Sequence, residues 1–249
     1  MTSHVVSNFL TDTFDSVRQR ARNAARVALP QRCELCAGAS ATALLCAACE
    51  RDLPRIANAC PVCALPSPQG TSCGACLANP PPFDATFAAY IYAFPVDRMV
   101  QAFKYNGRLV LADWCAEAIL AARGQLDAPA PDAIIALPLA TARQRERGFN
   151  QAGEIARVIA TRTGFAHPVT GIHRIRASPP QAALPWNERA RNVRGAFVCD
   201  ATIAGLHVAV IDDVMTTGET VAEFARTLKR AGARRVENWV VARTLPPGQ

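Results

Sequence analysis

Apolar and polar positions follow two rhythms along the last two thirds of the chain. A β-branched and aromatic run predicts a strand over residues 85–94, and apolar residues at helical spacing predict a helix over 109–123. The same patterns predict the remaining elements: strands at 133–138, 167–170, 206–211 and 235–243, and helices at 150–163 and 220–232. Gly232 stands where a helix commonly ends. Strands that alternate with helices are typical of an α/β domain with a mainly parallel sheet, whose ligands bind beyond the carboxyl ends of the strands.

A proline-rich segment marks a boundary near residue 80. The sequence "LANPPPF" follows Cys76, and its prolines exclude a helix. We therefore expect an N-terminal extension over 1–32, a cysteine-rich module over 33–79 and the α/β domain over 80–249. The stretch "SVRQRARNAARVAL" in the extension fits a basic helix, either with a solvated face or resting on an interface or nucleic acid.

Eight of the ten cysteines form four C-x-x-C pairs with a repeated spacing. Each repeat is C-x2-C-x9-C-x2-C, and the members are Cys33, Cys36, Cys46 and Cys49 in the first repeat and Cys60, Cys63, Cys73 and Cys76 in the second. Two C-x-x-C turns on facing hairpins offer four thiolates to one metal ion, which suits structural zinc. The equal spacing favours sequential pairing, with one zinc per repeat, over interleaved pairing.

Other uses of these thiols are less consistent with the sequence. A disulfide framework needs an oxidising compartment, and a C-x-x-C redox pair normally occurs once beside a strand and a helix. An iron–sulfur cluster remains an alternative, because it uses the same ligands. Cys115 and Cys199 stand alone, and we expect both to be inert thiols.

The charge balance is basic, with a formal net charge of +7, and half of the 249 residues are hydrophobic. Lys104 and Lys229 are the only lysines, so 25 of the 27 basic residues are arginine. This bias fits either a GC-rich genome or guanidinium groups that grip phosphates. We expect a cytoplasmic protein, because no apolar run is long enough to span a membrane and "MTSHVVSNFLTDTF" lacks the basic flank and apolar core of a signal peptide.

One apolar run near the C-terminus ends in two adjacent carboxylates, Asp212 and Asp213, in "HVAVIDDVMTTGET". Like charges in contact repel each other, so the pair needs a compensating role unless both side chains are simply solvated. Residues 216–220 are predicted to enter a helix N-terminus, where free N–H groups, threonine hydroxyls and Gly218 suit a phosphate. Carboxylates that accept hydrogen bonds from sugar hydroxyls, directly or around Mg²⁺, would complete a site for ribose 5-phosphate. Neither lysine follows a glycine, which excludes a P-loop.

Further basic residues supply candidate anion ligands. Arg143, Arg145 and Arg147 follow the strand predicted at 133–138 and suit a pyrophosphate, although an exposed basic loop would look the same. Lys104, in "FKYNGR", either reaches a phosphate or is solvated. The arginine- and proline-rich stretch 174–194 could close over a bound diphosphate and exclude water.

Taken in order, these motifs resemble those of the ComF family. The similarity runs from about Cys33 to Arg243 and includes the four C-x-x-C pairs, "FKYNGR", "LPLATARQRERGFNQ", "RASPPQAALPWNERARN" and "VIDDVMTTGET". It implies a type I phosphoribosyltransferase-like fold preceded by a double zinc ribbon, with Asp212 and Asp213 on the ribose hydroxyls. The implied 5-phosphate loop consists of Thr216, Thr217, Gly218, Glu219 and Thr220. Glu219 would contribute only its backbone, because its carboxylate would repel a phosphate.

The resemblance implies two kinds of function. One is phosphoribosyl transfer from phosphoribosyl pyrophosphate, with Mg²⁺, to an acceptor that the sequence does not identify. The family's role in uptake of transforming DNA implies the other, a non-catalytic protein that binds single-stranded DNA or couples to the competence helicase and uptake proteins. In that case the phosphoribosyl site would serve as a ligand sensor.

Overall fold

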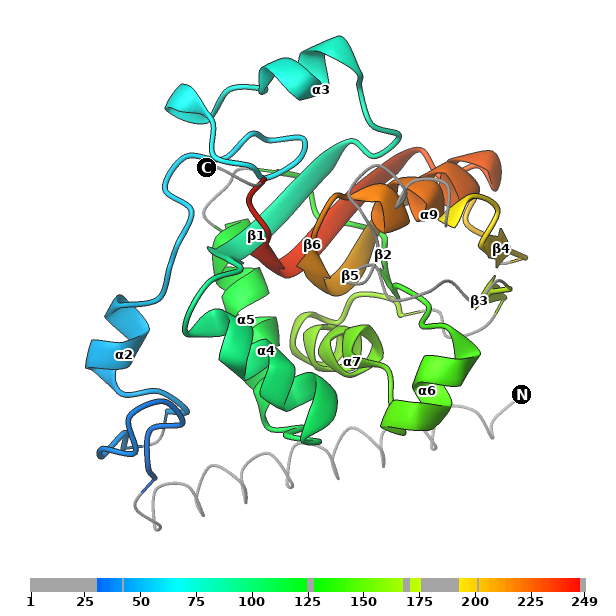
Figure 1. Ribbon diagram of the computed structural model, residues 1–249. Coiled ribbons are helices and arrows are strands. Elements are labelled where there is room, and N and C mark those ends of the chain that lie inside the picture. The colour runs from blue at the N-terminus through cyan, green and yellow to red at the C-terminus, as the bar shows by residue number, and fades with distance from the viewer. Residues whose placement is uncertain are drawn as a thin grey trace. The chain divides into compact units, whose positions relative to one another are not determined.

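The computed structural model describes residues 31–41, 43–124, 128–167, 171–175, 193–200 and 202–246 (Figure 1). The chain divides into two compact units, an N-terminal unit over Met1–Leu53 and a C-terminal unit over Pro54–Gln249. The predicted basic helix and most of the arginine- and proline-rich stretch lie outside the described residues. The boundary predicted near residue 80 stays a prediction, although the C-terminal unit begins well before it.

In the N-terminal unit the described chain forms a turn and one short helix, α2 (Ala47–Arg51). An isolated bridge joins Arg32 to Ala39 around the turn. The second repeat is built in the same way inside the C-terminal unit, with η1 (Pro68–Gly70) and α3 (Gly74–Ala78). A bridge there joins Ala59 to Pro66.

A four-stranded parallel sheet forms the centre of the C-terminal unit. Its strands lie in the order β1 (Ala85–Ile91), β6 (Arg235–Arg243), β5 (His207–Met215) and β2 (Ala133–Ala136). The strands are buried along nearly their whole length because helices cover both faces. The predicted fold class, a mainly parallel α/β sheet with flanking helices after a small cysteine-rich module, is confirmed.

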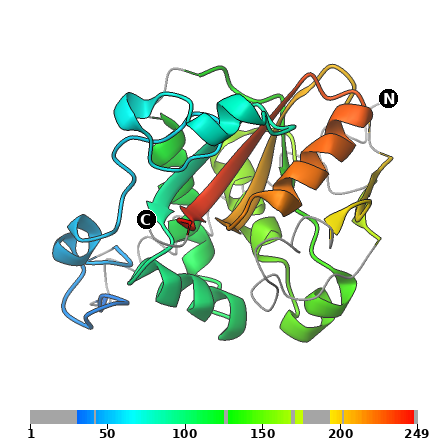
Figure 2. The same cartoon turned by 45° about the horizontal axis from the view of Figure 1, so that its top comes forward.

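Figure 2 shows α9 (Glu219–Arg230) on one face of the sheet and α5 (Leu111–Gly124) and α7 (Gln151–Thr163) on the other. Phe224 and Leu228 of α9 are fully buried against the strand residues Val210 and Val240. The helix ends as predicted at Gly232, whose φ of 95° is left-handed. The N–H of Gly232 donates to Lys229 and that of Ala233 to Leu228, which makes a Schellman motif.

The sequence analysis missed several elements. Two are helices, α4 (Val96–Tyr105) and α6 (Thr141–Arg147), and two are short antiparallel strands, β3 (Ile172–Arg174) and β4 (Phe197–Cys199). The strand predicted at 167–170 lies mostly outside the described residues. None of the helices in the described ranges combines the length and the apolar character that crossing a bilayer demands.

Candidate functional site

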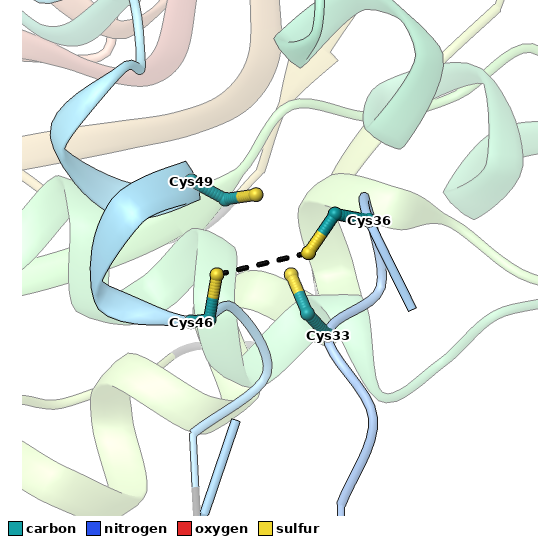
Figure 3. Close-up of side chains that lie close together, drawn as sticks. All are labelled: Cys33, Cys36, Cys46 and Cys49. Atoms are coloured by element: carbon teal, nitrogen blue, oxygen red, sulfur yellow. Dashed lines mark hydrogen bonds between the residues drawn. The ribbon is translucent and has the colours of Figure 1, made fainter. Parts of the chain in front are cut away.

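The eight paired cysteines gather into two clusters in sequence order. The first cluster is Cys33, Cys36, Cys46 and Cys49, and the second cluster is Cys60, Cys63, Cys73 and Cys76. Within each cluster all four sulfur atoms lie within 4.8 Å of one another. Figure 3 shows the four side chains of the first cluster pointing toward one another. Four sulfurs at about 2.3 Å from a zinc ion are about 3.8 Å apart. The Sγ–Sγ distances of 3.8 Å between Cys36 and Cys46 and 3.6 Å between Cys63 and Cys73 therefore fit structural zinc.

Backbone N–H groups favour the thiolate form of at least one cysteine in each cluster, whereas the pKa values of Cys49, Cys63 and Cys76 are raised. Burial opposes ionisation of Cys33, but the backbone N–H groups around it, led by that of Cys36, lower its pKa to about 6. In the second cluster burial again opposes ionisation of Cys60, and the N–H groups of Cys73 and Cys63 lower its pKa to about 7. A thiolate that forms near neutral pH is ready to bind a metal ion.

The two carboxylates of the acidic motif lie within a strand, not after it. The predicted strand stopped at Ile211, whereas β5 continues to Met215 because β6 pairs with it over this length. On its other side β2 ends at Ala136, opposite Ile211. Asp212 and Asp213 therefore lie where one edge of β5 has lost its neighbour, at the carboxyl end of the sheet.

At this edge a cavity of about 470 Å³ opens within the C-terminal unit. Several segments of the C-terminal unit line it. Their members include Lys104 from α4, Arg143 and Arg147 from α6, Asn150 and Gln151 at the start of α7, Arg174 from β3, and Asp212, Asp213, Thr216, Gly218 and Thr220 from β5 and the start of α9. The structure thus brings together most of the residues that the sequence analysis selected. Arg145, Thr217 and Glu219 are not among its lining residues.

Lys104 compensates part of the charge of the acidic pair. Its Nζ lies 2.9 Å from Asp213 Oδ1, and both side chains are largely buried. Burial lowers the pKa of Lys104, but the carboxylate of Asp213 outweighs that effect and raises the pKa above its usual value. Lys104 was expected to reach a phosphate or the solvent, and the structure gives it a protein partner that the sequence did not suggest.

Asp212 has no such ion pair among the described residues, and its surroundings disfavour the carboxylate form. Burial and the neighbouring charge of Asp213 raise the pKa of Asp212 to about 7. Lys104, Arg174 and the backbone N–H of Asp213, which donates to Asp212 Oδ1 at 2.8 Å, oppose the shift only in part. A ligand that donates hydrogen bonds or brings positive charge would therefore favour ionisation of Asp212.

The N-termini of two helices lie at this cavity. Gly218 precedes α9 with a φ of 87°, a left-handed conformation in which other residues are strained. Asn150 caps α7, since its side chain accepts from the N–H of Ala152 and donates to the carbonyl of Leu137. Such N-termini attract anions through partial positive charge and unpaired donors.

Besides Lys104, the basic side chains of the cavity come from α6 and β3. Arg147 stacks over Tyr105, with 5.0 Å between guanidinium and ring centroid, and donates to Gln151 Oε1 at 3.0 Å. Arg174, at the end of β3, also lines the cavity, and burial together with the nearby Arg143 lowers its pKa.

Gln151 is a site residue that sequence reasoning missed. Its side chain is buried and lines the cavity, and its Nε2 has no hydrogen-bond partner in the described structure. A buried donor without a partner is costly unless a ligand or a water accepts from it. The position of this glutamine at the start of a predicted helix, after a basic motif, was the one available signal.

Comparison with known proteins gives matches to both parts of the chain. Residues 24–77 match the family model described as "Double zinc ribbon domain". The "DNA utilization protein YhgH" of Salmonella typhi is 36% identical over 206 residues, which are 81% of this chain and 91% of that protein. "Competence protein F" of Haemophilus influenzae is 29% identical over 178 residues, 69% of this chain and 78% of that protein.

Among solved structures, the allosteric regulatory enzyme of purine biosynthesis matches with a TM-score of 0.36 and 18% sequence identity. The match covers 56% of this chain and 29% of that enzyme.

Proposed function

The chain belongs to the ComF family of competence-related, phosphoribosyltransferase-like proteins, and on this premise we propose that its cavity binds phosphoribosyl pyrophosphate together with Mg²⁺. One observation carries the proposal. A pair of carboxylates on β5 lies in the same cavity as two helix N-termini and three arginine side chains, those of Arg143, Arg147 and Arg174. Acceptors for sugar hydroxyls thus lie beside donors for phosphates.

The carboxylates suit the ribose of this ligand. Asp212 and Asp213 accept hydrogen bonds from the two vicinal hydroxyls, and Lys104 forms its ion pair with Asp213 from the side of α4. The N–H groups of residues 216–220 take the 5-phosphate at the start of α9. Glu219 does not line the cavity, so its carboxylate is not among the groups that face the phosphate.

The pyrophosphate group faces the other wall. Arg143 and Arg147 of α6 and the N-terminus of α7 supply its donors, and the unpaired Nε2 of Gln151 adds a neutral one. When bound, Mg²⁺ neutralises charge on the departing pyrophosphate. The chain's own residues then hold the sugar and both phosphate groups in place, and transfer of the phosphoribosyl group needs no nucleophilic side chain. The acceptor is a further molecule that this geometry does not name.

Calorimetry tests the proposal on the double variant Asp212→Asn and Asp213→Asn. Each charged acceptor is worth about 1.5–3 kcal/mol, so affinity for phosphoribosyl pyrophosphate with Mg²⁺ should fall at least about a hundredfold. Stability should fall as well, because Asp213→Asn leaves the buried Lys104 without its ion-pair partner. Asp132→Asn is the matched control, since Asp132 accepts from the N–H of His207 at the opposite end of β5. Unchanged affinity in the double variant, or equal loss in the control, would contradict the proposal.

A second candidate function is binding of single-stranded DNA. It is favoured by the name of the Salmonella typhi relative and by the net charge of +7. We propose that such binding, direct or through competence uptake proteins, would involve the arginine-rich surface. Affinity should then fall linearly on a log–log plot against salt, by about 0.7 per phosphate neutralised. Undetectable binding at low salt would remove this function from the isolated chain.

A further inference from the structure

Arg243 is the last residue of β6 and one of the few fully charged side chains that the core encloses, with 3% of its surface exposed. A guanidinium has five donors in a rigid fork, and burying it without acceptors is costly. The acceptors of Arg243 are therefore part of what fixes the structure around it. They come from two regions more than 150 residues apart in the sequence.

One acceptor belongs to the second cluster. The Nε of Arg243 donates to the carbonyl of Cys63 at 2.8 Å. The same turn is attached to the sheet elsewhere, since the N–H of Thr86 in β1 donates to the carbonyl of Pro61 at 3.1 Å. Val62, between these two contacts, packs against the hydrophobic core of the α/β sheet.

Two of the remaining acceptors, Met215 and Thr216, lie at the start of the phosphate loop, and the third is the adjacent residue Thr244. Nη1 of Arg243 donates to the carbonyls of Met215 at 3.0 Å and Thr244 at 2.8 Å, and also to the carbonyl of Thr216. A peptide unit is planar, so a carbonyl that is held in one direction fixes the N–H on the same unit. The held carbonyls of Met215 and Thr216 thus orient the N–H groups of Thr216 and Thr217 away from Arg243.

We propose that Arg243 is a positioning residue that ties the phosphate loop to the second cluster, so that the loop keeps its ligand-binding conformation only while that cluster is intact. This inference rests on the proposed function of the cavity. It predicts that the two clusters differ in their effect on the ligand, although their sequences repeat. Loss of a thiol from the second cluster frees the Cys63 turn, Arg243 loses an acceptor, and the oriented N–H groups of residues 216–217 become mobile.

The direct test is Arg243→Lys, with Arg123→Lys as a matched control. Lysine keeps the charge but lacks the planar fork that spans several carbonyls. Arg123 is also buried and donates to a backbone carbonyl, that of Ala128, but it does not line the cavity. We expect Arg243→Lys to weaken binding of phosphoribosyl pyrophosphate with Mg²⁺ about tenfold or more and to accelerate amide hydrogen exchange at residues 216–218. Arg123→Lys should change neither, even if it lowers the melting temperature as much.

The second test compares Cys76→Ser with Cys49→Ser, the equivalent positions of the two clusters. Each variant should lose about one zinc per chain. Only Cys76→Ser should speed exchange at 216–218 and weaken ligand binding. Equal effects of the two serine variants, or normal exchange and affinity in Arg243→Lys, would overturn the proposal.

Exchange in the ligand-free protein separates this inference from the proposed function. If the wild-type chain fails to bind phosphoribosyl pyrophosphate, the proposed function fails. The inference about Arg243 still holds in that case if, in the ligand-free protein, Arg243→Lys accelerates amide exchange at residues 216–218 and Arg123→Lys does not. If Cys76→Ser unfolds the C-terminal unit, the comparison of Arg243→Lys with Arg123→Lys tests the proposal by itself.

Discussion

The two cysteine clusters have the same local geometry and different surroundings. Ala37 and Ala64 each follow the second cysteine of a cluster, and their φ angles are 59° and 58°. Cys46 and Cys73 each precede a five-residue helix with nearly equal backbone angles. The repeat in the sequence therefore determines the turn, the helix and the thiol geometry alike in both halves.

The surroundings of the two clusters differ because the boundary between the two compact units lies between them in the sequence. The first cluster belongs to the N-terminal unit, and Cys36 is exposed. The second belongs to the C-terminal unit, where the equivalent Cys63 is buried and its carbonyl accepts from Arg243. The repeated cysteine motif thus determines the local fold of each cluster. The tertiary contacts of a cluster determine which other parts of the protein its loss would affect.

Loss of the metal ion should give the largest difference between the two clusters. The purified protein should hold close to two zinc ions, and Cys33→Ser and Cys60→Ser should each lose one. Folding of such a cluster depends on metal, with apparent binding energies of about 10–16 kcal/mol. We expect only Cys60→Ser to lower the melting temperature of the C-terminal unit. Metal analysis with thermal melts checks this, and a single zinc, or coloured iron, in the wild type would contradict the two-site structure.

Truncation tests the same contrast at the level of domains. A chain that begins at Pro54 should fold and keep its ligand affinity. A chain that begins at residue 80, the boundary predicted from the prolines, leaves Arg243 without the carbonyl of Cys63 and Thr86 without that of Pro61. Unsatisfied buried groups of this kind cost about 1–3 kcal/mol each, and more when charged. Denaturant unfolding of both truncations measures the difference, and equal stabilities would place the second cluster outside the fold.

Much of this arrangement could be predicted from local sequence signals. The spacing of the cysteines gave both clusters, and the apolar run at 235–243 gave β6 with its correct bounds. The signal for α4 was also present, because its buried residues recur at helical spacing, but it was not used. In contrast, α6 buries no residue, so it has no apolar period to detect.

The missed parts of the site depend on contacts between distant segments. Lys104 and Asp213 form an ion pair across more than a hundred residues, and no local pattern links them. Arg243 was read only as the end of a strand, because its acceptors are backbone carbonyls, which a sequence does not distinguish. The strands β3 and β4 have three residues each, too few to show an alternating pattern.

The pH dependence of binding should depend on Asp212 and on neither cluster. Since its pKa is about 7 in the free protein and a bound ligand favours the carboxylate, affinity should rise about tenfold from pH 6 to pH 8. The folded state binds the proton more tightly than the unfolded chain does, so stability should fall as pH rises from about 4 to 7. Calorimetry and melts over this range check both signs. Asp212→Asn should flatten both profiles, whereas Cys49→Ser should preserve their shape; a pH effect that survives Asp212→Asn would come from the ligand.

The smallest contrast comes from the left-handed alanines at the equivalent turns. Glycine adopts such angles without the steric cost that alanine carries, so Ala37→Gly and Ala64→Gly should each relieve about 1 kcal/mol of local strain. Because the turn at Ala64 belongs to the C-terminal unit, Ala64→Gly should raise the melting temperature of that unit by about 2–4 °C. Ala37→Gly should leave this transition unchanged and only slow the release of one zinc ion to a chelator. Calorimetric melts and chelator kinetics on the two variants measure these effects. If both variants shift the melting temperature of a single transition equally, the two clusters unfold together. The clusters would then not differ in their effect on the C-terminal unit.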